Sequence, residues 1–266
     1  MVNIAITGKG GVGKTTIAGI LSRFLGGEEY NVLAIDADPD MNLGSVLGVD
    51  MSEVTPLSEN KELIAERTGS MPGKNMGGGV FKLNPKVDDI ADAYGVKAPD
   101  KVNLIIMGTV DKGGSGCMCP SDAFLRALLR HLIIGKDDAV VLDMEAGIEH
   151  LGRGTAKSVN SLIIVVEPGM KSLKTAQRIK KLAEDIGIPN LGAIINKVRE
   201  TAESEIIKER LKNMNIPFWG VVPFDENFMK ADLKGKSPLD FSPESQGVQA
   251  MEKIKNNILR ESKDKC

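Results

Sequence analysis

The chain has 266 residues and a formal net charge of −2, with 34 lysines and arginines against 36 acidic residues. Such a balance lacks the basic footprint of a nucleic-acid-binding protein. Apolar runs stay shorter than the roughly 18–20 residues that a membrane helix needs, and the N-terminus lacks the basic start of a signal peptide. We therefore expect a cytoplasmic protein with no nucleic-acid partner and no membrane attachment.

Short apolar runs alternate with helical patterns along the chain. Runs that are apolar on both faces, as at residues 140–142 and 162–166, are typical of a parallel sheet covered by helices. The alternation predicts a doubly wound α/β domain, with a mostly parallel sheet flanked by helices, over residues 1–266. The glycine-rich stretch Gly69–Gly79 predicts a flexible insert of unassigned role. The predicted strands are Val2–Thr7, Asn31–Asp36, Val80–Leu83, Val102–Met107, Ala139–Asp143, Leu162–Glu167, Leu191–Asn196 and Trp219–Val222, and the predicted helices are Lys14–Leu25, Phe124–Ile133, Ser172–Ile186, Ser204–Met214 and Gly247–Leu259.

The segment Gly8–Thr15 matches the phosphate-loop pattern G-x-x-x-x-G-K-[ST] between a predicted strand and a predicted helix. Its glycines let backbone N–H groups turn toward phosphate oxygens, and the N-terminus of the following helix adds positive potential. We expect Lys14 to reach the β- and γ-phosphates and the Thr15 hydroxyl to bind Mg²⁺. The predicted nucleotide-binding residues of this segment are Gly8, Gly10, Gly11, Val12, Gly13, Lys14, Thr15 and Thr16.

Carboxylates follow two of the predicted strands. Asp36, Asp38 and Asp40 lie within five residues, and such a cluster repels itself unless a metal, a lysine or polarised water compensates. Asp143 ends an apolar strand, as in a Walker B element, and is expected to hold a Mg²⁺-bound water, with Asp36 near the same ion. Gly147 follows at the spacing of a second switch, where its N–H would sense the γ-phosphate.

The run Gly-Lys-Gly-Gly-Val-Gly-Lys-Thr-Thr that begins at Gly8 resembles the deviant Walker A class of ATPases. This class includes partition and cell-division ATPases, the nitrogenase iron protein and metallocentre-assembly ATPases. The resemblance implies that Lys9 crosses a dimer interface to the partner's nucleotide, where it stabilises the leaving phosphate. It also implies that Asp38 orients the attacking water, with Asp40 in the same switch and Asp143 in the second one.

The same resemblance implies two contacts to the adenine ring. Asn196 ends a predicted strand at the position where the class reads the base, and Pro223 lies where the class packs against it. The run from Asn196 to Arg199, Asn-Lys-Val-Arg, lacks the Asn-Lys-x-Asp signature of guanine sites. We therefore expect ATP and ADP as the nucleotides.

Cys117 and Cys119 form a Cys-x-Cys pair in a glycine-rich stretch that ends at Pro120. These neighbours favour a loop in which both sulfurs can converge, and a following helix N-terminus would favour the metal-binding thiolates. Two such loops in a symmetric dimer supply four thiolates, which suit Ni²⁺, Zn²⁺ or an iron–sulfur cluster. An incidental pair or a redox disulfide is the competing interpretation. The third cysteine, Cys266, has no assigned role.

Together the motifs resemble the CooC-type nickel-insertion accessory ATPases over nearly the full chain, most specifically at 112–120. In that family a Cys-x-Cys pair binds nickel across a dimer and ATP drives its delivery. The resemblance implies an ATP-hydrolysing nickel metallochaperone, homodimeric on ATP or metal binding, with Zn²⁺ also suited to the Ni²⁺ site. Its client would be carbon monoxide dehydrogenase or acetyl-CoA synthase. Two alternatives stay open: an iron–sulfur electron-transfer ATPase like the nitrogenase iron protein, and a partition or positioning ATPase that acts as a switch.

Overall fold

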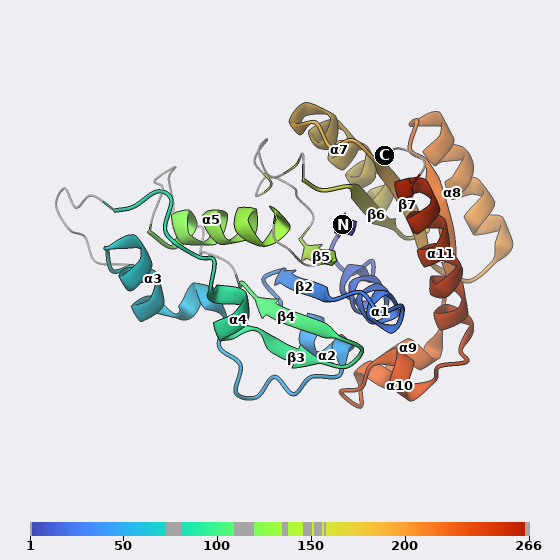
Figure 1. Ribbon diagram of the computed structural model, residues 1–266. Helices are drawn as coiled ribbons and strands as arrows, with labels where there is room; N and C mark the ends of the chain where they lie inside the picture. Colours follow the sequence, from blue (N-terminus) through green and yellow to red (C-terminus); the bar gives the residue numbers. More distant parts are fainter. Residues whose placement is uncertain are drawn as a thin grey trace.

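The computed structural model of the chain describes residues 2–72, 81–108, 120–134, 138–145, 151, 156 and 158–263. The strands form one sheet in the order β3-β4-β2-β5-β1-β6-β7-β8 (Figure 1). Neighbouring strands are parallel, except that β3 pairs antiparallel with β4. The strands are β1 (Val2–Gly8), β2 (Val32–Ala37), β3 (Val96–Ala98), β4 (Val102–Ile106), β5 (Ala139–Met144), β6 (Ser161–Val166), β7 (Leu191–Val198) and β8 (Phe218–Pro223).

The predicted strands agree with this sheet except for Val80–Leu83, which is wrong. Residues 81–83 form no strand, Leu83 is exposed, and Val80 lies outside the described residues. The sheet instead ends in β3, an edge strand of three residues whose side chains are half-buried or exposed. So short a strand leaves no apolar run in the sequence, because its position is set by pairing with β4 rather than by burial of its own side chains.

The sheet is covered on both faces, as β5 shows. Because successive side chains of a strand point to opposite faces, Val140 and Leu142 enter one apolar layer while Ala139 and Val141 enter the other. The first layer is built with residues of α3, α5, α7 and α8, and the second with residues of α1, α2 and α11 (Figure 1). This arrangement confirms the doubly wound α/β prediction.

The predicted helices are confirmed, with differences of a few residues at their ends. Several short helices were not predicted, because segments of four to eight residues are too short to display an apolar period of 3.6. No helix in the described ranges is long and apolar enough to cross a bilayer. The helices are α1 (Lys14–Gly27), α2 (Leu43–Leu47), α3 (Lys61–Thr68), α4 (Ile90–Tyr94), α5 (Pro120–Ile134), α7 (Met170–Ile186), α8 (Thr201–Asn213), α9 (Glu226–Asp232), α10 (Pro238–Phe241) and α11 (Gln246–Lys263), with a 3₁₀ turn at Leu57–Glu59.

The parallel strands bring their carboxyl ends to one edge of the sheet. In the centre, β1 lies between β5 and β6, and the chain leaves β1 directly into the loop before α1. Open α/β sheets bind ligands at this edge, outside the carboxyl ends of their strands. The phosphate loop, the acidic segment after β2 and the end of β7 therefore meet at the place where the fold favours a site.

Candidate nucleotide-binding site

The phosphate loop is an abrupt turn between β1 and α1. Its backbone adopts positive φ at Gly11 (79°) and at Gly13 (92°), a conformation that side chains with a Cβ rarely tolerate. Val12 is fully buried beneath the loop and anchors it to the apolar layer of α1. The loop therefore stands above the N-terminus of α1, where unpaired N–H groups and the helix dipole favour an anion.

Two of the predicted site residues, Lys14 and Asp38, form an ion pair. Lys14 is the first residue of α1, is only 7% exposed, and places its Nζ 3.4 Å from Asp38 Oδ2. The segment after β2 is ordered by its own carboxylates, since the N–H of Asp38 donates to Asp36 Oδ1 and the N–H of Asp40 donates to Asp38 Oδ1. The ion pair holds Asp38 at the mouth of the phosphate loop.

Asp36 and Asp143 are paired by the register of β2 and β5, and both are fully buried. Burial raises the pKa of Asp143 to about 7 and outweighs the opposing effects of the Thr15 hydroxyl and the Lys14 ammonium. Burial also raises the pKa of Asp36 to about 6, although N–H groups of Asp38 and Leu43 hydrogen-bond its carboxylate.

Asp143 has the properties of a metal-binding carboxylate. Neither of its oxygens accepts a hydrogen bond of regular geometry from the described part of the chain, and both are buried. A buried unpaired carboxylate is costly unless a cation or an ordered water compensates it. Mg²⁺ commonly uses one or two carboxylates, waters and nucleotide phosphates, so Asp143, Asp36 and the Thr15 hydroxyl fit that ion.

A cavity of about 470 Å³ lies beside the phosphate loop. Some predicted nucleotide-binding residues do not line it: Gly8, Gly10 and Val12. Residues of α9, of α10 and of the loop before α9 complete its walls. These residues were not predicted, because both helices are too short to show a helical period in the sequence. The predicted residues that line the cavity are Gly11, Gly13, Lys14, Thr15, Thr16, Asp38, Asp40, Asn196 and Pro223, and those that were missed include Lys197, Phe224, Phe228, Asp232, Lys236 and Pro238.

Lys9 does not point into this cavity within its own chain. Its Nζ lies 3.1 Å from Glu167 Oε1, and both side chains are about one-third exposed. Glu167 follows β6, whose Val165 pairs with Gly8 of β1, so the two charged residues leave neighbouring strands side by side. No local sequence pattern indicates this ion pair, because it joins residues 158 positions apart.

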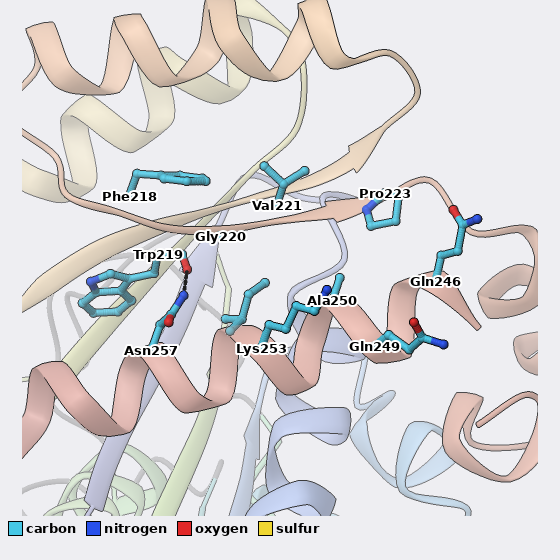
Figure 2. A pocket seen from close by; sticks show the side chains of 11 residues that line it. Phe218, Trp219, Gly220, Val221, Pro223, Gln246, Gln249, Ala250, Lys253 and Asn257 are labelled. Atoms are coloured by element: carbon cyan, nitrogen blue, oxygen red, sulfur yellow. Dashed lines mark hydrogen bonds between the residues drawn. The ribbon is translucent and has the colours of Figure 1, made fainter. Parts of the chain in front are cut away.

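A second cavity, of about 510 Å³, lies between β8 and α11 (Figure 2). It is lined by residues of β8, whose Trp219 side chain faces the helix, and by residues of α11, among which Asn257 donates to the Trp219 carbonyl at 3.1 Å. Its lining includes neither the phosphate loop nor any of the acidic residues at the carboxyl ends of β2 and β5. The first cavity is therefore the candidate nucleotide site.

Three predicted residues lie outside the described part of the chain: Gly147, Cys117 and Cys119. Cys266, which had no assigned role, lies outside it too. Most of the predicted insert Gly69–Gly79 lies outside it as well. Within the described ranges, no group of three or more His, Cys, Asp or Glu residues could hold a metal ion. The proposed role of the Cys-x-Cys pair consequently depends on its donor chemistry and on the comparisons below.

The chain is similar to several known proteins along most of its length. The model of the CobQ/CobB/MinD/ParA nucleotide-binding domain matches residues 4–239. The chain is 45% identical over 245 residues to the carbon monoxide dehydrogenase accessory protein CooC of Rhodospirillum rubrum, covering 91% of each protein. It is 47% identical over 260 residues to an uncharacterised ATP-binding protein of Methanocaldococcus jannaschii, covering 97% of this chain and 98% of the relative.

A solved structure shows the same architecture. The septum site-determining protein MinD from Pyrococcus horikoshii OT3, complexed with Mg-ADP, superposes with a TM-score of 0.71 at 25% identity, covering 100% of this chain and 99% of that one. The chain therefore belongs to the CobQ/CobB/MinD/ParA family of nucleotide-binding domains and, within its deviant Walker A class, to the CooC-type ATPases.

Proposed function

We propose that this ATPase is a nickel metallochaperone that binds Ni²⁺ through Cys117 and Cys119 at a nucleotide-dependent dimer interface. Its client would be carbon monoxide dehydrogenase or acetyl-CoA synthase. The observation that carries the proposal is the Cys-x-Cys pair within a chain that is 45% identical to a carbon monoxide dehydrogenase accessory protein. Two chains related by a two-fold axis would offer four thiolates, a donor set suited to Ni²⁺ and also to Zn²⁺.

The topology supports a link between the metal and the nucleotide. The Cys-x-Cys pair lies between β4 and α5 in sequence, directly before Pro120 of α5. Because β4 is parallel to β2, its chain leaves the sheet at the same edge as the acidic segment that begins at Asp36. A change in the dimer that follows ATP binding at this edge would therefore alter the geometry of the thiolates, and hydrolysis would release the metal to the client.

The residues of the site have separate roles in ATP hydrolysis under this proposal. Lys14 binds the β- and γ-phosphates, and Asp38, held 3.4 Å from it, orients the attacking water. Mg²⁺, when bound by Thr15 and Asp143, supplies positive charge to the phosphates. Lys9 acts in the partner's site, where its ammonium stabilises the charge that develops on the transferred phosphate.

Lys9 must first leave its own chain's Glu167. The ion pair between them is partly exposed, so it costs little to break, typically up to about 1 kcal/mol. Closure of the dimer would exchange the carboxylate partner of Lys9 for the phosphates of a nucleotide. The transfer would couple ATP occupancy of one protomer to the position of a loop in the other.

Anaerobic nickel titration, with light scattering to measure mass, tests the proposal. It is run without nucleotide, with ADP and with ATP, on the wild type and on the double variant Cys117→Ala/Cys119→Ala. Cys266→Ala serves as the matched control, because it also removes a thiol. We expect one nickel per two chains, lost in the double variant, retained in the control and altered by nucleotide. Nickel binding that ignores both cysteines of the pair would overturn the proposal and favour a partition-type switch.

A further inference from the structure

The carboxyl end of β7 departs from regular strand geometry beside the phosphate loop. Three steps along β7, from Ile195 to Val198, stand opposite two steps along β8, from Val221 to Pro223. Within this bulge Lys197 adopts a positive φ of 60°, which is uncommon for a residue with a Cβ. Bulges of this kind redirect a side chain and are frequent next to active sites. The redirected side chain here is that of Lys197.

Lys197 reaches across to the phosphate loop, 186 residues away in the sequence. Its Nζ donates to the carbonyl oxygen of Gly11 at 2.6 Å. The preceding residue does the same with the next carbonyl, since Asn196 Nδ2 donates to the oxygen of Val12 at 2.8 Å. Consecutive residues at the end of β7 thus hold consecutive carbonyls of the loop.

The fit between this strand end and the loop is close. A Cβ on Gly13 would lie 2.4 Å from Asn196 Nδ2 and 3.9 Å from Lys197 Cε. Both side chains also line the nucleotide cavity. When a peptide carbonyl is held on one side, the N–H of the same peptide faces the opposite side, because the peptide unit is planar. The Val12 carbonyl held by Asn196 therefore sets the direction of the Gly13 N–H. The Gly11 peptide is held at both ends, by Lys197 at its carbonyl and by the Lys9 carbonyl, which accepts from the Val12 N–H at 3.3 Å.

We propose that Lys197 is a positioning residue for ATP binding and hydrolysis. By holding the Gly11 carbonyl, it fixes the shape of the phosphate loop before any nucleotide arrives. A loop arranged in advance loses less conformational entropy on binding, so its affinity for every nucleotide with a β-phosphate is higher. The strained backbone at Lys197 is maintained because it aims the ammonium at the loop. The role is independent of the metal and of the dimer.

Substitutions at position 197 separate the effect of the ammonium group from the effect of the backbone conformation. Lys197→Asn removes the amine and keeps a residue that tolerates positive φ, whereas Lys197→Arg keeps a cation that can reach the carbonyl. Lys212→Met, at an exposed position of α8, is the matched control for loss of a surface lysine. The readouts are ADP and ATP affinity by calorimetry, kcat and KM for ATP, and hydrogen exchange of the loop amides without nucleotide.

We expect Lys197→Asn to bind ADP and ATP each roughly fivefold more weakly, as for loss of an exposed charge-assisted hydrogen bond. The loop amides should exchange faster in this variant, while Lys197→Arg restores most of both properties and Lys212→Met matches the wild type. Wild-type affinities with unchanged loop exchange in Lys197→Asn would overturn the proposal. So would a loss of ATP affinity with no loss of ADP affinity, because that pattern indicates a direct contact to the γ-phosphate.

Discussion

Replacing Asp143 with asparagine should make the stability of the nucleotide-free protein less dependent on pH. The wild-type carboxyl is fully buried, and burial raises its pKa from the ordinary 3.8 to about 7. Between those values the folded chain keeps a proton that the unfolded chain releases, so the free energy of unfolding falls as pH rises. Asparagine removes this titration, and with it the loss of stability above pH 4.

The size of the effect follows from the shift. One pKa unit corresponds to about 1.4 kcal/mol, so roughly three units lower the wild-type free energy of unfolding by about 4 kcal/mol between pH 4 and pH 8. Asp36, whose pKa is raised to about 6, contributes to the same coupled titration. The difference in free energy of unfolding between variant and wild type should therefore shift by about 3 kcal/mol in favour of the variant from pH 4.5 to pH 8. Any destabilisation by the new amide itself does not depend on pH and leaves this shift unchanged.

The assay is urea unfolding in EDTA without nucleotide, at several pH values. The comparison between the two proteins cancels the carboxylates with lowered pKa values, because these are common to both, and reports the coupled titration of Asp143 and Asp36. Asp92→Asn, at an exposed position of α4, is the control and should follow the wild type at every pH. Steady-state ATPase activity of Asp143→Asn should fall roughly 100-fold, since the carboxylate that holds Mg²⁺ is gone. A constant stability difference from pH 4.5 to pH 8 would refute the reasoning.

Three further substitutions test other parts of the account. Glu167→Gln frees Lys9 and should strengthen ATP-dependent dimerisation about two- to fivefold per protomer, as measured by sedimentation; weaker dimerisation would contradict the cis ion pair. Gly13→Ala should lower ADP affinity at least roughly tenfold in calorimetry, because a Cβ there meets Asn196 and φ is 92°; wild-type binding would contradict this. Arg23→Met removes the partner of Asp100, in the loop between β3 and β4, and of Asp240 in α10, and should lower the free energy of unfolding in urea by about 2 kcal/mol. An unchanged unfolding midpoint would show that the buried guanidinium is not stabilising.

The core of the fold was predictable because burial leaves a strong local pattern. The strand that ends at Asp143 is apolar on both faces, and the sheet buries both faces. The opposite holds for β3, where half-exposed side chains leave nothing to detect. The walls of the nucleotide cavity from α9 and α10 were missed for a related reason, because helices of four to seven residues carry no measurable period.

The site was predictable where a motif fixes its chemistry and not where contacts are long-range. The phosphate loop was identified from spacing and Asp38 from the resemblance to the deviant Walker A class, and the structure brings Lys14 and Asp38 together. Glu167 and Lys197 were not identified, since each meets the loop only after the sheet has assembled. The bulge and positive φ that aim Lys197 depend on pairing between β7 and β8, which no local pattern around Asn196 reveals.

Transfer of nickel from the loaded protein to its client tests the central claim most directly. The protein is loaded anaerobically with radioactive nickel and mixed with nickel-free carbon monoxide dehydrogenase, with ATP, with ADP or without nucleotide, and nickel on the client is counted after separation. The account predicts transfer that requires ATP and that fails in Lys9→Ala and in Cys117→Ala/Cys119→Ala. Equal transfer without nucleotide, or from the double cysteine variant, would contradict it.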